Sequence, residues 1–595
     1  MGAVYGVEAT TFRVWAPHAN AVYVTGEFAG WAPKAYALQH EADGYWACAV
    51  AGVQPGQAYA FVITYQGQEL WRVDPYAREV RGEGEKATAI VVDTEAFDWE
   101  GDNFRMPNWN EMVIYELHVG SFAPDAASGR GTFDTVRGKL EYLASLNVNC
   151  IKLMPPAEFD GEAGWGYNPV YPFAVETAYG GPHALKQLIK EAHRHGIAVL
   201  IDVVYNHLGP SGKHLWRFDG WGQGDFGGLY FYNDARAETP WGHTRLNYGL
   251  PQVRRYLIDN ALMWLREYRA DGLRIDSVSH IRATAGNPDD PTQDLPEGWL
   301  FLQELNQAVH AEFPWKLTVA EDLLCSEWVT APTDKGGAGF DTQWDCNFIY
   351  PIREILTHAQ DEDRSMQAVV QAIGFMYGGN AFNRVIFTES HDAVAQGNQR
   401  LPVEVDADRP DGYFAIKRAV LGMVLAAVSP GIPMIFQGQE FLTPDEFLFP
   451  ETNALRWELA EVHAGIVRLT SDAFGLRRNL AGQSAGLTGQ HVDFLHASEE
   501  SRMLVFLRRK AEGGPGDDIV VAVNFSAEAR VGYRIPLPAS ATYTVLLNTA
   551  SKLYHPDFED VGLTALDAER IAQDGYAFSA PLDIAPYSLL VLAQS

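Results

Sequence analysis

Four short apolar segments of this chain each lead into acidic, histidine or arginine residues, and this pattern constrains the fold more than any other feature. The four sequences are Asp202-Val-Val-Tyr-Asn-His207, Asp271-Gly-Leu-Arg-Ile-Asp276, Val319-Ala-Glu321-Asp322 and Phe387-Thr-Glu-Ser-His391-Asp392. Short aliphatic and β-branched runs are typical of buried strands. Because the carboxyl ends of the strands in a parallel barrel meet at one face, we expect these polar residues to form one site.

Strands and helices alternate from about residue 111 onward. Helical spacing is present at residues 135–146 and 183–195. Strands are predicted at residues 113–119, 150–154 and 198–204 and near residues 272, 317, 384 and 433, with an eighth near Gly339-Phe-Asp. The alternation indicates a (β/α)8 TIM barrel or a doubly wound sheet. Polar residues follow many strands rather than a single switch point, which favours the barrel. We assign it residues 106–485, with a long loop at 207–247.

The segments on either side of the barrel have a different pattern. The chain has 595 residues, too many for one hydrophobic core, so two to four domains are expected. Residues 1–105 contain short strands separated by Gly, Pro and Asp, and strands return after residue 485. These patterns predict an N-terminal β-sandwich and a C-terminal β-sandwich at 486–595. The fold class is therefore multidomain α/β.

Charge and cysteine content restrict the partners and the compartment. The net charge is −31, which argues against nucleic acid and against an anionic membrane surface but not against a neutral substrate. The sequence has no signal-peptide pattern and no apolar run long enough to span a bilayer. Its four cysteines, without a CxxC pair, predict buried free thiols in a reducing compartment, so we expect the cytoplasm; they are Cys48, Cys150, Cys325 and Cys346.

Two carboxyl groups with different pKa values suit cleavage of a glycosidic bond. Arg274 lies two positions before Asp276, on the same face of the strand, so its guanidinium should keep Asp276 ionised as a nucleophile. Glu321 ends an apolar strand, where a less polar pocket raises the pKa and suits a general acid.

The other polar residues of the four segments suit substrate binding. Asp392 and His391 lie together and are expected to bind sugar hydroxyls, and His207 is expected to bind at the same subsite. Tyr167 offers a face for stacking. Asp202 is grouped with these residues, although we expect it to act through hydrogen bonds that support the structure.

At these residues the chain resembles the α-amylase superfamily, glycoside hydrolase family 13, over its whole length. Phe12-Arg-Val-Trp-Ala-Pro-His-Ala and Gly26-Glu-Phe-Ala-Gly-Trp resemble the family 48 carbohydrate-binding module. The resemblance implies a retaining double displacement on α-glucans (glycogen, amylose or maltooligosaccharides). It implies these roles: nucleophile Asp276, acid/base Glu321, transition-state stabiliser Asp392, and subsite residues Arg274, His207, His391 and Tyr167. Asn206 matches a calcium ligand of many members, so the resemblance allows a calcium ion, although no cofactor is required.

The motifs disagree about the subtype. Phe387-Thr-Glu-Ser-His-Asp and Phe436-Gln-Gly-Gln-Glu-Phe resemble branching enzymes, whereas His280, four residues after the nucleophile, resembles α-amylases and is included among the substrate-binding residues. Trp165-Gly-Tyr-Asn-Pro and Thr239-Pro-Trp-Gly resemble both branching enzymes and maltooligosyltrehalose trehalohydrolases. We expect a 1,4-α-glucan branching enzyme. The alternatives are an α-1,4-glucan hydrolase, either amylase-like or releasing trehalose, and a silent glucan-binding protein, which the three carboxylates argue against.

Overall fold

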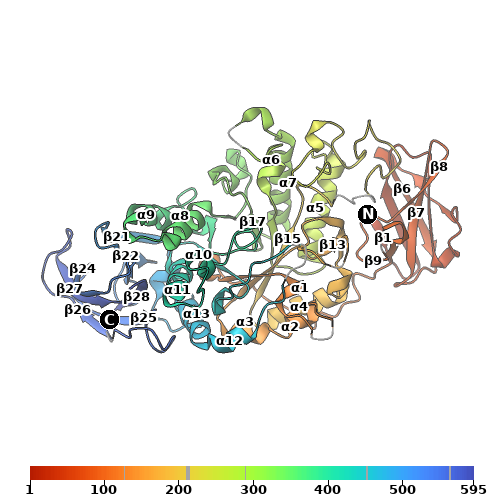
Figure 1. Ribbon diagram of the computed structural model, residues 1–595. Coiled ribbons are helices and arrows are strands. Elements are labelled where there is room, and N and C mark those ends of the chain that lie inside the picture. The colour runs from red at the N-terminus through yellow and green to blue at the C-terminus, as the bar shows by residue number, and fades with distance from the viewer. Residues whose placement is uncertain are drawn as a thin grey trace.

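The chain forms a central barrel with an all-β domain on each side (Figure 1). The computed structural model describes residues 1–82, 84–125, 128–161, 163–209, 215–287, 290–449, 453–561 and 564–595. The N-terminal and C-terminal domains lie at opposite sides of the barrel, so the molecule is elongated. This arrangement confirms the predicted fold class.

Eight parallel strands close the barrel. In order they are β11 (Ile114–Leu117), β12 (Cys150–Leu153), β15 (Ala198–Val203), β16 (Gly272–Ile275), β17 (Leu317–Ala320), β18 (Thr342–Trp344), β19 (Arg384–Ile386) and β20 (Ile432–Phe436). Strand β11 pairs with both β12 and β20, which completes the ring. The eighth predicted strand, expected near Gly339, is β18 and begins three residues later, at Thr342.

Helices cover the outside of the barrel because their apolar faces pack against the strands. The longer ones are α4 (Gly181–Arg194), α5 (Pro251–Arg266), α7 (Pro296–Glu312), α8 (Cys346–Thr357), α9 (Met366–Gly374), α11 (Tyr413–Val428) and α13 (Ala464–Arg477). The helix predicted at 135–146 is divided into α2 (Phe133–Arg137) and α3 (Leu140–Ser145). Gly138 lies at the break and caps α2, in agreement with the low helix propensity of glycine.

The N-terminal domain is built from two antiparallel sheets. One contains β1 (Gly2–Val4), β2 (Ala9–Trp15), β6 (Tyr45–Ala51) and β5 (Gln39–His40). The other contains β4 (Tyr36–Ala37), β3 (Ala21–Gly26), β7 (Ala58–Tyr65), β10 (Thr88–Ile90), β9 (Val80–Arg81) and β8 (Gln68–Arg72). Alternating buried side chains of both sheets, such as Phe12 and Phe61, form the core between them.

The C-terminal domain is also all-β. Its larger sheet contains β21 (His491–Ser498), β22 (Met503–Arg509), β23 (Ile519–Asn524), β28 (Ser588–Gln594), β25 (Thr542–Asn548) and β26 (Ala565–Asp567). A smaller sheet pairs β24 (Arg530–Leu537) with β27 (Phe578–Ile584). One face of the larger sheet has its own apolar core, which includes Leu495, Val505 and Leu592. No helix in the described parts of the chain is long and apolar enough to cross a bilayer.

The N-terminal domain contacts the long loop that follows β15. His18 of this domain approaches Asp219 of the loop with Nδ1 at 2.8 Å from Oδ2, and Arg72 Nε donates to the carbonyl of Phe218 at 2.8 Å. Residues 210–214 of the predicted loop lie outside the described residues. The contacts show that the flanking domain holds part of a loop at the face of the barrel where the strands end.

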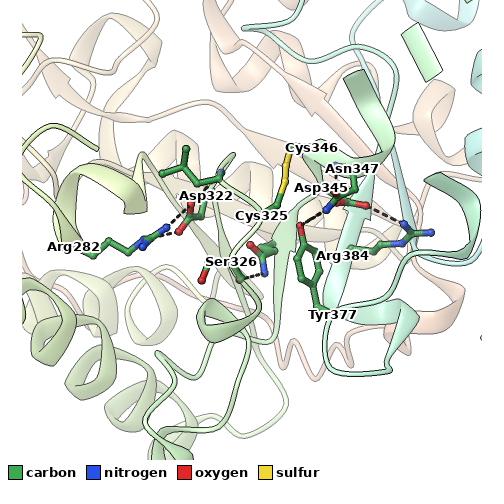
Figure 2. The surroundings of a disulfide bond; sticks show 11 residues. Arg282, Asp322, Cys325, Ser326, Asp345, Cys346, Asn347, Tyr377 and Arg384 are labelled. Atoms are coloured by element: carbon green, nitrogen blue, oxygen red, sulfur yellow. Dashed lines mark hydrogen bonds and ion pairs between the residues drawn. A yellow bond between two sulfur atoms is a disulfide. The ribbon is translucent and has the colours of Figure 1, made fainter. Parts of the chain in front are cut away.

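The prediction of four free cysteines is wrong. Cys325 and Cys346 form a disulfide with their Cα atoms 6.2 Å apart, whereas Cys48 and Cys150 are free (Figure 2). Cys325 follows β17 and Cys346 follows β18, and the parallel register brings these two loops together. The spacing of 21 residues carries no such signal, since the pairing depends on strand order. Cysteine usage therefore no longer argues for a reducing compartment.

Buried ion pairs lie on both sides of the disulfide. Arg282 Nε is 2.8 Å from Asp322 Oδ2, in the segment before Cys325. Arg384 Nη1 is 3.0 Å from Asp345 Oδ2, directly before Cys346 (Figure 2). The disulfide therefore joins two segments that are each already anchored, and the first of them begins at Glu321.

Removal of the disulfide is expected to destabilise the barrel. In the double variant Cys325→Ser/Cys346→Ser, the open loop gains entropy in the unfolded chain, and the free energy of unfolding should fall by about 3 kcal/mol. Urea unfolding measures the change. Cys48→Ser is the control and should change stability by less than about 0.5 kcal/mol, since this free cysteine is only half-buried. Titration of the denatured, unreduced protein should detect two thiols; four thiols would contradict the pairing.

Candidate active site

The three predicted carboxyl groups line one cavity at the carboxyl ends of the barrel strands. Asp276 directly follows β16, Glu321 directly follows β17, and Asp392 lies in the loop after β19. The cavity has a volume of about 190 Å³ and is lined by Trp165, Tyr167, Asn168, His207, Trp241, Asp276, Ser277, Glu321, His391, Asp392, Gln396 and Phe449. Six of the nine predicted site residues are therefore brought together around one space.

Arg274 lies beneath this cavity and holds the two central carboxyl groups. Its Nη1 atom is 2.9 Å from Asp276 Oδ1, and its Nη2 atom is 2.9 Å from Glu321 Oε2. The first contact is a hydrogen bond, whereas the second is an ion pair without hydrogen-bond geometry. Both carboxyl groups thus lie against one buried guanidinium, which fixes their relative position.

The environment separates the pKa values of these two groups. Burial raises the pKa of Glu321 well above its ordinary value, with the charges of Asp276 and Asp392 adding to the effect and Arg274 opposing it. Burial also raises the pKa of Asp276, but Arg274 and a hydrogen bond from Asn206 limit the rise. Glu321 therefore retains a proton more readily than Asp276, which is the division of roles that a retaining mechanism needs.

Asn206 supports Asp276 rather than offering an open metal ligand. Its Nδ2 donates to Asp276 Oδ2 at 2.6 Å and to the Asp276 carbonyl at 3.1 Å, while its Oδ1 lies against the ring of His207. Within the described residues, no group of three or more His, Cys, Asp or Glu side chains is arranged to hold a metal. Both ends of the Asn206 amide are therefore engaged by neighbouring side chains, and the calcium ion that the resemblance allows stays an expectation.

His391 is positioned by a buried ion network that the sequence did not indicate. Glu116, at the end of β11, accepts from His391 Nδ1 at 2.8 Å and from the His391 backbone at 2.9 Å. Lys152 Nζ is 2.9 Å from Glu116 and also pairs with Asp202. Burial raises the pKa of Glu116, but Lys152 and His391 outweigh this and bring it below the ordinary value. A carboxylate thus holds Nδ1 of His391 and turns Nε2 toward Asp392, 3.3 Å away.

Asp202 and Arg274 do not line the cavity. Asp202 is buried, accepts from Tyr167 Oη at 2.7 Å and is 2.9 Å from Arg274. It therefore fixes the Tyr167 side chain, whose ring stacks on His391 with centroids 4.9 Å apart. The expected structural role of Asp202 agrees with this placement.

Trp241, from the loop after β15, forms another part of the cavity wall. Its ring stacks on His207 at 4.6 Å and meets His280 edge-on at 5.0 Å. His280 does not line the cavity but lies behind Trp241, and its Nδ1 is 2.8 Å from Ser277 Oγ. Burial lowers the pKa of His207 to about 3, so this ring is neutral at ordinary pH. His280 therefore contacts Trp241 from behind and does not itself reach the cavity.

Several cavity residues were missed by sequence reasoning. Trp165 and Asn168 flank Tyr167 in the connection between β13 (Ala157–Phe159) and β14 (Pro169–Val175). Phe449, which meets Trp165 edge-on at 5.2 Å, and Gln396 carry no local signal, because they come from long loops. Trp165 and Trp241 lie within the Gly-Trp-Gly-Tyr and Thr-Pro-Trp-Gly segments, so those motifs were the available signal.

Family models match all three parts of the chain. Residues 1–77 match carbohydrate-binding module 48 (isoamylase N-terminal domain), residues 116–221 and 217–501 match the alpha amylase catalytic domain, and residues 495–595 match the alpha amylase C-terminal all-beta domain.

Curated relatives and solved structures are similar over nearly the whole length. The 1,4-alpha-glucan branching enzyme of Rubrobacter xylanophilus is 31% identical over 99% of this chain and 82% of its own. The enzyme of that name from Burkholderia thailandensis is 30% identical over 99% of this chain and 71% of its own.

A Salmonella typhimurium protein described provisionally as an alpha amylase covers 100% of this chain and 99% of its own, with a TM-score of 0.74 and 25% identity. A pullulanase from Anoxybacillus sp. LM18-11, with a TM-score of 0.74 at 21% identity and covering 100% of this chain and 87% of its own, shares the fold. With its catalytic-domain match spanning most of the chain, this protein belongs to the alpha-amylase family.

Proposed function

We propose that this alpha-amylase family enzyme is a 1,4-α-glucan branching transglycosylase. The observation that carries the chemistry is the pair of carboxyl groups held against Arg274 with pKa values moved apart. The observation that favours branching is similarity to branching enzymes over nearly the full chain, including both flanking domains.

The reaction proceeds in two displacements. The Asp276 carboxylate attacks the anomeric carbon of an α-1,4-linked glucose, and Glu321 gives its proton to the departing glycosidic oxygen. A covalent glycosyl ester on Asp276 results. The Glu321 carboxylate then takes the proton from the 6-hydroxyl of a second glucan, whose oxygen attacks the anomeric carbon and releases Asp276. The two inversions restore the α configuration.

The other site residues act on the sugar between these carboxyl groups. Asp392 and His391 bind its hydroxyls, and the bond from Glu116 fixes the orientation of the His391 ring. Tyr167 and Trp241 provide aromatic walls, which exclude water from the covalent intermediate. Exclusion of water favours transfer over hydrolysis, since both use the same intermediate. Hydrolysis, including release of trehalose, is the alternative outcome.

Product analysis tests the proposal. Amylose and maltooligosaccharides are incubated with the enzyme, and α-1,6 linkages and reducing ends are counted by proton NMR. New α-1,6 signals without a matching rise in reducing ends are expected. Rising reducing ends without new linkages would identify a hydrolase, and maltooligosyltrehalose would then be the next substrate.

We propose that no cofactor is required, so EDTA should leave the rate unchanged; restoration of a lost rate by calcium would contradict this.

Substitution of the nucleophile separates catalysis from binding. Asp276→Asn keeps the shape and the hydrogen-bonding capacity of the side chain but removes its charge, so kcat should fall on the order of 10⁴-fold or more. The measurement is the rate of iodine-stain loss with amylose. Asp557→Asn, an exposed aspartate far along the chain in the C-terminal domain, is the matched control and should retain the rate. A variant at Asp276 with undiminished function would favour the silent glucan-binding protein.

The pH profile should report the two carboxyl groups. Asp276 must be ionised, so activity falls as the pH drops through its pKa. Glu321 must be protonated, and because its pKa is raised, activity falls as the pH rises through that value. In Glu321→Gln, an α-maltosyl fluoride substrate, whose leaving group needs no proton, should still form the glycosyl ester, and the alkaline limb of this step should disappear. Persistence of the alkaline limb would assign it to another group.

A further inference from the structure

A second and larger cavity lies at the opposite end of the barrel from the catalytic carboxyl groups. It has a volume of about 640 Å³, within the range of roughly 300–1,000 Å³ typical of ligand sites. Its barrel residues precede strands rather than follow them: Trp109 precedes β11, Trp315 precedes β17 and Phe382 precedes β19. Residues 488–490 and Lys510, at the junction with the C-terminal domain, complete the lining. We call this cavity the basal groove.

The basal groove presents aromatic surface to solvent. Trp315 is 59% exposed, which is uncommon for so large an apolar residue unless it contacts something else. Trp109 and Phe382 are half-buried and pack against the apolar residues that fill the lower part of the barrel. The groove thus contains one free aromatic face and two faces fixed by the core, and such rigid faces stack well on the apolar side of a sugar ring.

Polar groups without protein partners lie beside these rings. Across the described residues, the side chains of Asn108, Gln490 and Lys510 appear in none of the hydrogen bonds or ion pairs, and Trp315 Nε1 donates to none. By contrast, Asn110 Nδ2 donates to the Thr488 carbonyl at 3.0 Å and so joins the segment before β11 to the junction with the C-terminal domain. The Asn110 amide therefore fixes the wall of the groove, while the side-chain amides of Asn108 and Gln490 remain available to bind hydroxyl groups of a ligand.

The charge of the basal groove selects a neutral ligand. The chain contains 76 acidic residues, yet none lines this groove, and Lys510 is its one charged lining residue. Another surface cavity, between the N-terminal domain and α4, is by contrast lined by many charged residues, namely Glu79, Asp93, Asp98, Glu100, Lys186 and Lys190. A single lysine is too few for a phosphate backbone. Aromatic faces, free amides and low charge together match an uncharged polyhydroxyl chain.

We propose that the basal groove binds a segment of α-glucan that is distinct from the segment in the catalytic cavity. This inference rests on the proposed function, since it assigns the same substrate class to a second site. A long or branched glucan bound at both ends of the barrel would gain affinity through the raised effective concentration at the second site, whereas a short oligosaccharide would not.

The test compares long and short substrates in full-length variants. In Trp315→Ala, glycogen affinity measured by retardation in glycogen-containing gels should weaken by roughly 2- to 10-fold, the range expected for loss of one aromatic stacking contact. The KM for glycogen should rise, while kcat and KM for α-maltosyl fluoride should stay unchanged. Phe414→Ala, which removes an aromatic residue that is 46% exposed outside the groove, is the matched control and should change neither value.

A second variant protects the test against a folding defect. Gln490→Ala removes only an unengaged amide at the rim and should produce a smaller loss of glycogen affinity with an unchanged thermal midpoint. Unaltered glycogen retardation in both variants, with wild-type activity on glucans, would overturn the inference and leave the proposed function intact. An altered sedimentation coefficient in Trp315→Ala with unaltered retardation would also overturn it, because the groove would then seat a second copy of the chain. Absence of any action on glucans by the wild type would instead refute the proposed function.

Discussion

The catalytic face depends on one buried guanidinium. Arg274 is inaccessible to solvent yet contacts Asp202, Asp276 and Glu321, each from a different position around the barrel. Three carboxyl groups so close together would repel one another, and burial would favour their neutral forms. Burial raises the pKa of both Asp276 and Glu321, and the positive charge of Arg274 opposes this rise at each of them. Loss of Arg274 would therefore alter the pKa values of both Asp276 and Glu321 and leave buried carboxyl groups without a partner.

A second cation extends this charge balance across the barrel. Lys152 pairs with Glu116 and Asp202, so two cations and four carboxyl groups form one connected network at the base of the cavity. Glu116 connects this network to His391, and Tyr167 connects it to the aromatic wall. The orientation of His391 and Tyr167 is thus set by Glu116 and Asp202, neither of which lines the cavity. Such a network is costly to bury unless every member is paired, which explains why the residues come from neighbouring strands.

The strands and the catalytic carboxyl groups could be predicted from the sequence because both have local signals. Apolar runs specify strands, and parallel closure brings their carboxyl ends together, so Asp276, Glu321 and Asp392 could be grouped. The Cys325–Cys346 pair could not be found this way, since it depends on β17 and β18 being neighbours. Lys152 was hidden for another reason: a lysine within an apolar strand gives no sign of its partners. His280 lies four residues after Asp276 in the sequence, but Trp241 separates it from the cavity.

The flanking domains hold the two ends of the barrel in different ways. His18 and Arg72 of the N-terminal domain contact Asp219 and Phe218 in the loop whose later part carries Trp241, so this domain supports one wall of the catalytic cavity. At the other end, Arg508 of β22 donates to the carbonyl of Val428 at the end of α11, and Arg477 of α13 donates to the carbonyl of Leu487, at the start of the C-terminal part. Arginine side chains that donate to buried carbonyls thus join the C-terminal domain to the barrel floor. The basal groove lies at that junction, and its walls belong to two domains that buried hydrogen bonds join.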